Sequence, residues 1–356
     1  MADLNPVKGA HLVGSVSLED TDTVINSAVR TLGRHLGRIP DGETGPRQHW
    51  AYWQFTVIQQ DPSFEQDPEE PPRPFPLMTK GVLGQIEIRP AKFKSGIDLD
   101  SVKLNTTYAE HALSSYRQFD KLKKAALVPP DTRFMVALPT PLAIALPHIS
   151  PTAIPDFLKV YERSLLEDVE VIVANIPASE LSIQWDIACE VIGLEGGFPI
   201  IGSPQEFEEQ CFQQFARMDA AIPPEVEMGY HWCYGNPSGE HVIEPEDASL
   251  MVRLSNGVVA RSPRTIDYIH MPVPIERTDD AFFAPFANLN VPEDCQLYLG
   301  LVHIEDGIKG AEARISAARK YVREFGVATE CGLGRHAPEE IEPLLEIHAG
   351  CAAPIK

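Results

Sequence analysis

Short apolar runs alternate with amphipathic stretches along most of the 356-residue chain. The apolar runs have the length of buried strands, and they lie at residues 11–18, 36–40, 134–141, 180–186, 225–230, 267–272, 296–303 and 325–329. The stretches between them predict helices, notably at residues 21–32, 105–126, 155–173 and 311–325. Strands that alternate with helices about eight times predict parallel βαβ units, and most economically a (β/α)8 TIM barrel.

One connection departs from this regular order. Residues 61–76 are rich in proline and acidic side chains, which predicts an exposed loop without a core. Residues 82–89 have strand character, so we expect an extra hairpin after the second strand of the barrel. We expect the whole chain, residues 1–356, to form one barrel domain.

Polar side chains of reactive types fall at or just past the ends of the predicted strands. They are Ser15, Glu43, Asp186, His231, Cys233 and Cys331. Each has an ordinary structural explanation by itself, such as an Asp-Gly turn or a helix cap. In a (β/α)8 barrel, however, the carboxyl ends of the strands form the rim where catalytic groups gather.

Three of these residues form a candidate zinc site. His231 and Cys233 are two positions apart at the end of a strand, so their side chains point to the same face. An imidazole and a thiol side by side make half of a zinc site, and Cys331, which follows another strand, could supply a third ligand. A His-x-Cys pair is common by itself, and buried cysteines usually behave as small apolar residues.

The charge and composition of the chain limit the kinds of molecule that it is expected to bind. The formal net charge is −21, and no basic cluster offsets it, which disfavours nucleic acid and anionic membranes. No apolar run approaches the roughly 20 residues that cross a bilayer, and the first residues lack the pattern of a secretory signal. Six scattered cysteines are typical of a reducing, cytoplasmic setting. We expect a small-molecule substrate.

The motifs together resemble the catalytic barrel of cobalamin-independent methionine synthase, in the superfamily that includes uroporphyrinogen decarboxylase. Residues 231–234 are similar to the His-x-Cys-Tyr zinc motif of that family, and residues 330–333 are similar to its Asp-Cys-Gly-Leu motif. Weaker similarities lie at residues 14–15, 41–43, 138–140 and 183–186. The resemblance implies zinc held by His231, Cys233 and Cys331.

The same resemblance implies roles for the other strand-end residues. Ser15 would receive the carboxylate of an amino-acid substrate, and Glu43 and Asp186 would receive its amino group. The sequence departs from the family at the expected glutamate zinc ligand, where Pro272 stands, and the candidates to replace that ligand are His270 and Glu276. The long N-terminal half of methionine synthase and a counterpart of its folate-stacking segment are not found.

These residues favour a zinc-dependent methyl- or alkyltransferase that activates the thiol of a homocysteine-like amino acid. Two other hypotheses remain open. One is a metal-free lyase or decarboxylase of the same superfamily that uses Glu43, Asp186 and His231 as acid–base groups. The other is a small-molecule binding protein that kept the pocket without the chemistry. Arg335 is a candidate for binding an anionic substrate tail, and Trp50 is expected to pack against the Glu43 turn.

Overall fold

Eight parallel strands form the centre of the molecule. The computed structural model describes residues 7–200 and 202–355. The strand order is β1-β12-β11-β10-β9-β8-β7-β2, and a parallel bridge between Ala10 and Leu36 joins the two outer strands. The sheet therefore closes on itself, which confirms the predicted (β/α)8 barrel. The strands are β1 (Ala10–His11), β2 (Arg38–Pro40), β7 (Arg133–Pro139), β8 (Leu181–Ile187), β9 (Glu227–Trp232), β10 (Tyr268–Pro272), β11 (Gln296–Val302) and β12 (Gly326–Thr329).

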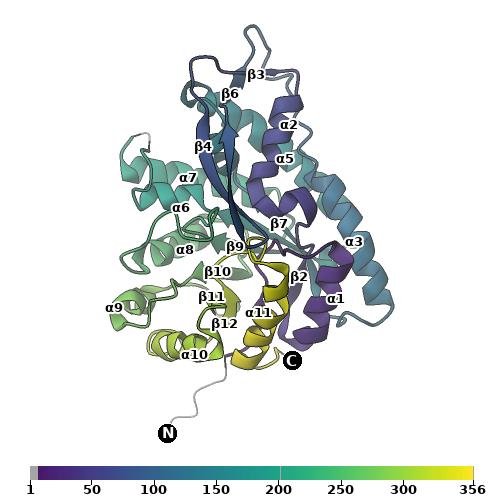
Figure 1. Ribbon diagram of the computed structural model, residues 1–356, viewed down its shortest axis with the longest axis vertical. Helices are drawn as coiled ribbons and strands as arrows, with labels where there is room; N and C mark the ends of the chain where they lie inside the picture. Colours follow the sequence, from purple (N-terminus) through teal and green to yellow (C-terminus); the bar gives the residue numbers. More distant parts are fainter. Residues whose placement is uncertain (1–6, 201, 356) are drawn as a thin grey trace.

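Helices surround this sheet and cover its outer face (Figure 1). The longer ones are α1 (Thr21–Thr31), α3 (Tyr108–Lys124), α5 (Ile154–Asn175), α7 (Pro204–Ala220), α8 (Ser249–Arg261), α10 (Gly307–Ala318) and α11 (Pro338–Cys351). The shorter ones are α2 (Gln54–Gln60), α4 (Pro141–His148), α6 (Cys189–Leu194) and α9 (Asp280–Phe283). The 3-10 segments are η1 (Gly33–His35), η2 (Gly45–Trp53), η3 (Pro151–Ala153), η4 (Ala178–Glu180) and η5 (Ala284–Asn288). Of the helices described, none is both long and apolar enough to span a membrane.

Local sequence explains why these elements begin and end where they do. The hydroxyl of Ser203 accepts the backbone N–H of Glu206, and the Glu206 carboxylate accepts the N–H of Ser203, so α7 begins with a capping box. Every residue of β8 is buried, because helices cover one face and the barrel interior the other. Helix α10 ends at Ala318, seven residues before the predicted end, and Gly326 instead begins β12.

The connection from β2 to β7 carries two small antiparallel pairs. The predicted hairpin is confirmed as β4 (Arg73–Thr79) and β5 (Val82–Ile88). The expectation of a plain loop at residues 61–76 is wrong, because β3 (Phe64–Gln66) pairs with β6 (Ala91–Phe93) and β4 begins within it. The pairing buries Phe64 against Phe93, with ring centroids 4.5 Å apart, and this contact gives the segment a small core.

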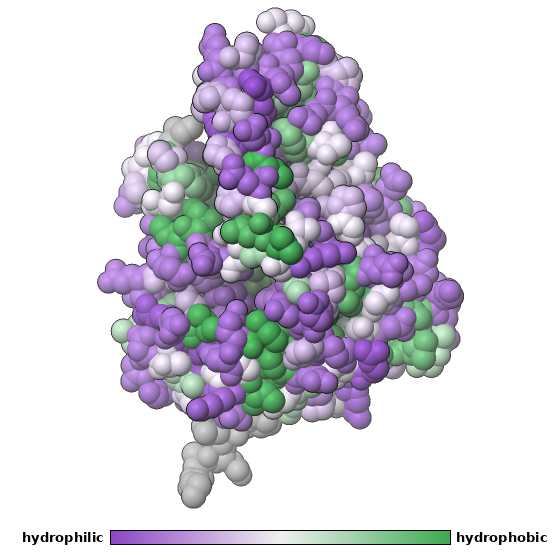
Figure 2. Space-filling model, viewed as in Figure 1, coloured by the Kyte–Doolittle hydropathy of each residue, from purple (hydrophilic) through white to green (hydrophobic). Residues whose placement is uncertain are grey.

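The β4–β5 hairpin extends over the carboxyl ends of the barrel strands (Figure 1). The N–H of Met78 donates to the carbonyl of Pro237, and the N–H of Gly81 donates to the carbonyl of Arg335, each at 2.7 Å. Val82 and Leu83 at its turn are exposed. An apolar patch near the middle of the face in Figure 2 lies where the hairpin ends in Figure 1. The hairpin thus ties the loops after β9 and β12 together.

The barrel interior is polar near its amino-terminal end. The fully buried guanidinium of Arg38 lies 3.8 Å above the ring centroid of Tyr268. Its Nε donates to Glu227 at 2.6 Å, and its Nη2 donates to Gln296 at 2.9 Å. A buried cation is tolerated only when it is paired and hydrogen-bonded, so these partners stabilise the lower half of the barrel.

Two histidines, His148 and His348, are buried in helices α4 and α11, outside the barrel interior. The Nδ1 atoms of His148 and His348 lie 2.8 and 2.7 Å from the carbonyls of Ile144 and Leu344. A carbonyl only accepts, so each Nδ1 carries the proton. Neither Nε2 has a hydrogen-bond partner among the described residues. Burial lowers the pKa of each imidazole to about 4.

We expect the protein to lose stability as the pH falls from about 6.5 to about 4. In this range the unfolded chain binds protons that the folded chain does not, so the free energy of unfolding falls with pH. A pKa lowered from 6.5 to about 4 corresponds to about 3 kcal/mol for each histidine. Denaturant unfolding of wild type and His348→Leu between pH 6.5 and pH 4 measures how the free energy of unfolding changes with pH, and the variant should lose less stability as the pH falls. An equal change of the free energy of unfolding with pH in the two proteins would contradict the role assigned to His348.

Candidate metal centre

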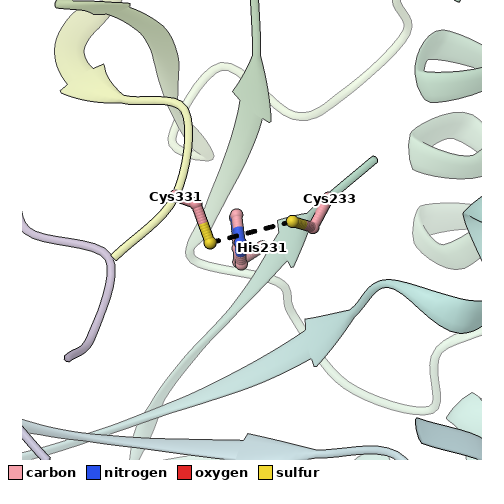
Figure 3. Close-up of side chains that lie close together, drawn as sticks. All are labelled: His231, Cys233 and Cys331. Atoms are coloured by element: carbon pink, nitrogen blue, oxygen red, sulfur yellow. Dashed lines mark hydrogen bonds between the residues drawn. The ribbon is translucent and has the colours of Figure 1, made fainter. Parts of the chain in front are cut away.

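The side chains of His231, Cys233 and Cys331 meet at the carboxyl-terminal rim of the barrel. His231 is the fifth residue of β9, Cys233 directly follows this strand, and Cys331 lies two residues after β12. Their ligand atoms all lie within 4.8 Å of one another. Figure 3 shows the imidazole of His231 between the two sulfur atoms. Trp232 points outward, where its indole N–H donates to Ser255.

The spacing of the two sulfur atoms fits a tetrahedral zinc ion. The Sγ atoms of Cys233 and Cys331 lie 3.8 Å apart. Two thiolates bound to zinc at about 2.3 Å with a tetrahedral angle would be separated by about 3.8 Å. A soft pair of sulfur ligands with one imidazole is a donor set that suits zinc. Three protein ligands leave a fourth position open, as in catalytic zinc sites.

The two thiols differ in their acidity. Hydrogen bonding from Cys233 holds the pKa of Cys331 well below its usual range, and Arg335 and His231 act in the same direction. The guanidinium Nη2 of Arg335 lies 2.8 Å from the Cys331 sulfur. The hydrogen bond to Cys331 and burial raise the pKa of Cys233 well above its usual range. In the metal-free protein, Cys331 therefore loses its thiol proton readily, whereas Cys233 keeps its own.

Ser15 supports the loop that carries Cys331. Val16 and Leu333 form a parallel bridge, so the chain after β1 runs beside this loop. A Cβ atom on Gly332 would lie 2.6 Å from the Ser15 hydroxyl, so only glycine allows this approach. The Thr329 hydroxyl donates to the carbonyl of Cys331 at 2.7 Å. Ser15 and Cys331 thus belong to one packed corner of the rim.

Asp186 lies next to the centre on the neighbouring strand. Its Cα is the register partner of His231 across the β8–β9 pair. Its two carboxylate oxygens accept the Gln184 amide at 2.8 Å and the Trp50 indole N–H at 3.0 Å. Burial raises the pKa of Asp186 to about 6, although His231 and these donors oppose the shift.

Glu43 occupies a tight turn after β2. Its backbone N–H donates to Asp41 at 2.8 Å, and Arg47 donates to the other oxygen of Asp41 at 2.7 Å. A Cβ on Gly14 would lie 2.8 Å from the Glu43 carboxylate, so the glycine lets this carboxylate enter the barrel mouth. Burial, then the charges of Asp186 and Asp41, raise the pKa of Glu43 well above its usual range.

The turn borders a small cavity. Its volume is about 10 Å³, and its lining includes Glu43, Arg47, Trp53 and Tyr108. This is room for about one water molecule, which is less than an amino-acid ligand needs. Trp50, which donates its indole N–H to Asp186, has φ of 56° and ψ of −123°, a conformation that is strained for a bulky residue. A ligand that reaches Asp186 must displace the Trp50 indole.

Neither His270 nor Glu276, the two residues suggested for a fourth ligand, belongs to the group of three that meets at the rim. Pro272 is buried at the end of β10, and Glu276 is exposed beyond it. Both ring nitrogens of His270 face protein atoms, namely His231 Nδ1 at 2.7 Å and the Thr329 carbonyl at 3.0 Å. Among the described residues, the group that could hold a metal consists of His231, Cys233 and Cys331 alone.

The sequence predicted that the strand-end residues would lie at the rim of the barrel, but it did not predict several of their hydrogen-bond partners. The contact between Gln184 and Asp186 could have been predicted from the sequence, because Gln184 precedes Asp186 by two positions on one strand and therefore faces the same side. The Trp50 contact had no comparable signal, because it depends on a strained turn inside η2. Arg335, the candidate for binding an anionic substrate tail, lies against the sulfur of Cys331, a contact that the sequence did not indicate.

Fold and site together define a (β/α)8 barrel with a His-Cys-Cys group at its carboxyl-terminal rim. Known structures share this barrel. One is a B12-independent methionine synthase from Shewanella sp. W3-18-1 in complex with selenomethionine, with 11% identity, a TM-score of 0.55 and 97% coverage of both chains. Another, from Listeria monocytogenes, is described as a vitamin-B12-independent methionine synthase. It shows 13% identity and a TM-score of 0.51, with coverage of 97% of this chain and 98% of that one.

At these identities the likeness shows a shared fold. No family model matches the sequence, and no curated protein matches it either. The resemblance inferred from the motifs is nevertheless met by full-length structural neighbours of the expected kind.

We expect the metal-free protein to carry one thiolate near neutral pH. Burial raises the pKa of the four other cysteines, so an early ionisation belongs to Cys331. Replacing Arg335 by Met removes the guanidinium and should raise this pKa, while Arg335→Lys, which keeps a cation, should raise it less. The ultraviolet absorbance of thiolate, followed against pH, measures the shift, and Cys331→Ser gives the background. A wild-type titration without an early step would contradict the assignment.

Proposed function

We propose that the protein is a zinc-dependent methyl- or alkyltransferase whose acceptor is the thiol of a homocysteine-like amino acid. The main support is the approach of one imidazole and two sulfurs to within 4.8 Å at the rim of the barrel. The selenomethionine bound in the Shewanella structure supports an amino-acid ligand for this fold. All six cysteines are free, which supports a reducing, cytoplasmic setting.

The residues present fit the metal in charge as well as in spacing. Two thiolates balance the charge of one divalent ion, and Arg335 adds a positive charge beside Cys331. When bound, zinc holds a coordinated substrate thiol as thiolate at neutral pH. In the transfer, the substrate sulfur loses its proton and forms a bond to carbon, while the leaving group of the donor keeps the electron pair of the broken bond.

Glu43 and Asp186 would hold the ammonium group of the substrate. Burial raises the pKa of both carboxyl groups, and the charge of Asp186 raises the pKa of Glu43 further. An ammonium group offers the missing positive charge and relieves this cost. Ser15 lies at the same corner as Cys331 and would hold the substrate carboxylate. The chain then positions the thiol at the open position of the metal.

We expect about one zinc ion per chain in protein prepared under reducing, zinc-replete conditions. Cys233→Ser and Cys331→Ser should each lose this zinc, because a hydroxyl replaces a thiolate ligand. Cys351→Ser, outside the centre, should retain it and serves as the matched control. Elemental analysis counts the metal, and X-ray absorption at the zinc edge should report a new sulfur ligand when homocysteine is added. Folded wild-type protein without zinc would count against the proposal.

We expect transfer to the thiol to stop after chelation and to return with zinc. Turnover that survives both chelation and Cys331→Ser would instead support a metal-free lyase or decarboxylase that uses Glu43, Asp186 and His231. Tight homocysteine binding without turnover would support a binding protein.

We expect Glu43→Gln to weaken homocysteine binding by about 10- to 100-fold, because a charged hydrogen bond contributes about 1.5–3 kcal/mol. The same thiol acid without an amino group should bind wild type and variant alike. Calorimetric titration of both ligands measures the difference. Equal losses for the two ligands would show that Glu43 shapes the pocket and does not bind the ammonium group.

A further inference from the structure

The imidazole of His231 is supported by a second histidine inside the barrel. His231 and His270 are register partners on β9 and β10, so both side chains point into the interior. Their Nδ1 atoms lie 2.7 Å apart, and His270 Nε2 lies 3.0 Å from the carbonyl oxygen of Thr329. His231 is 2% exposed and His270 is fully buried, so water does not replace these partners.

The carbonyl at the end of this chain of contacts determines where the protons lie. The Thr329 oxygen can only accept, so Nε2 of His270 must carry a hydrogen. In a neutral imidazole the other nitrogen is then an acceptor, so Nδ1 of His270 accepts. Its 2.7 Å partner, Nδ1 of His231, must therefore donate. The remaining nitrogen of His231, Nε2, is left with a free lone pair, and the His231 ring lies in the group whose ligand atoms, including both cysteine sulfurs, are within 4.8 Å of one another.

This placement of protons holds for a neutral His270, and the surroundings of His270 favour its neutral form. It is fully buried, the ring of His11 lies 5.8 Å away, and His231 is in direct contact. A protonated His270 would place two N–H groups face to face if His231 kept its Nδ1 proton.

We propose that His270 is a positioning residue that selects the Nδ1–H tautomer of His231 and so presents Nε2 as a metal ligand. The metal half of this inference rests on the proposed function, while the tautomer is a property of the metal-free chain. Strand β10, which ends at Pro272 without a ligand, would thus contribute to the centre through His270. A carboxylate, which often orients a metal-bound histidine, would add negative charge; His270 orients the ring without it.

The tautomer can be measured directly in the metal-free protein. Nitrogen-15 spectra of histidine-labelled protein distinguish Nδ1–H from Nε2–H rings, and His231→Gln identifies the signal of His231. We expect wild type to show His231 with the proton on Nδ1. In His270→Leu, which removes the acceptor, we expect that proton to shift to Nε2 in part of the population. An Nε2–H ring in wild type would overturn the inference.

Zinc affinity supplies the second measurement. Loss of a partner that orients a metal ligand typically weakens metal binding about 10- to 100-fold, and we expect this loss in His270→Leu. His270→Gln is the matched control, because an amide offers one acceptor to His231 and one donor to Thr329, and it should recover part of the affinity. Thermal unfolding shows whether each variant is folded.

The outcomes separate this inference from the proposed function. If wild type shows the Nδ1–H ring and His270→Leu weakens zinc binding, the inference is supported whatever reaction the protein catalyses. If folded His270→Leu keeps both the tautomer and the zinc affinity of wild type, the inference is overturned although zinc is bound. A wild-type chain that binds no zinc would overturn the proposed function and the ligand role, and the tautomer assignment would be judged by the spectra alone.

Discussion

The interior of this barrel depends on pairing between buried polar groups. Water is excluded there, so an unpaired polar side chain would cost stability. Arg38 is matched by Glu227 and Gln296 near one end. Higher up, the Gln184 amide donates both to the Val13 carbonyl and to Asp186, and its oxygen faces Nε2 of His11. The same requirement continues to the rim, where it fixes the orientation of the side chains that would bind metal and substrate.

The metal and amino-acid positions are adjacent because of strand register. Asp186 and His231 are partners on neighbouring parallel strands, and His231 and His270 are partners on the next pair. Side chains in one row of a barrel point into one layer of its interior. A carboxylate for the ligand head, an imidazole for the metal and the ring that orients it therefore arise from three consecutive strands without any special loop.

Much of this arrangement could be predicted from sequence because it follows from period and position. The two-residue spacing of His231 and Cys233 places them on one face, and the position of Cys331 after an apolar run brings it to the same rim. Contacts that depend on how the closed sheet curves could not be predicted in this way. The role of His270 requires the pairing of β9 with β10, and the Trp50 contact with Asp186 requires a strained backbone in η2. The end of α10 at Ala318 also lacked a glycine or proline signal.

The order in which the ligands occur along the chain has a consequence for assembly. Cys233 and Cys331 are separated by 98 positions, and Cys331 follows β12, the strand that pairs with β1 to complete the ring. During synthesis the first two ligands would emerge well before the third. An ion held by His231, Cys233 and Cys331 would cross-link the two ends of this long segment. Cross-links that close long loops reduce the conformational entropy of the unfolded chain most. Release of the ion and opening of the last quarter of the ring would then be thermodynamically linked events.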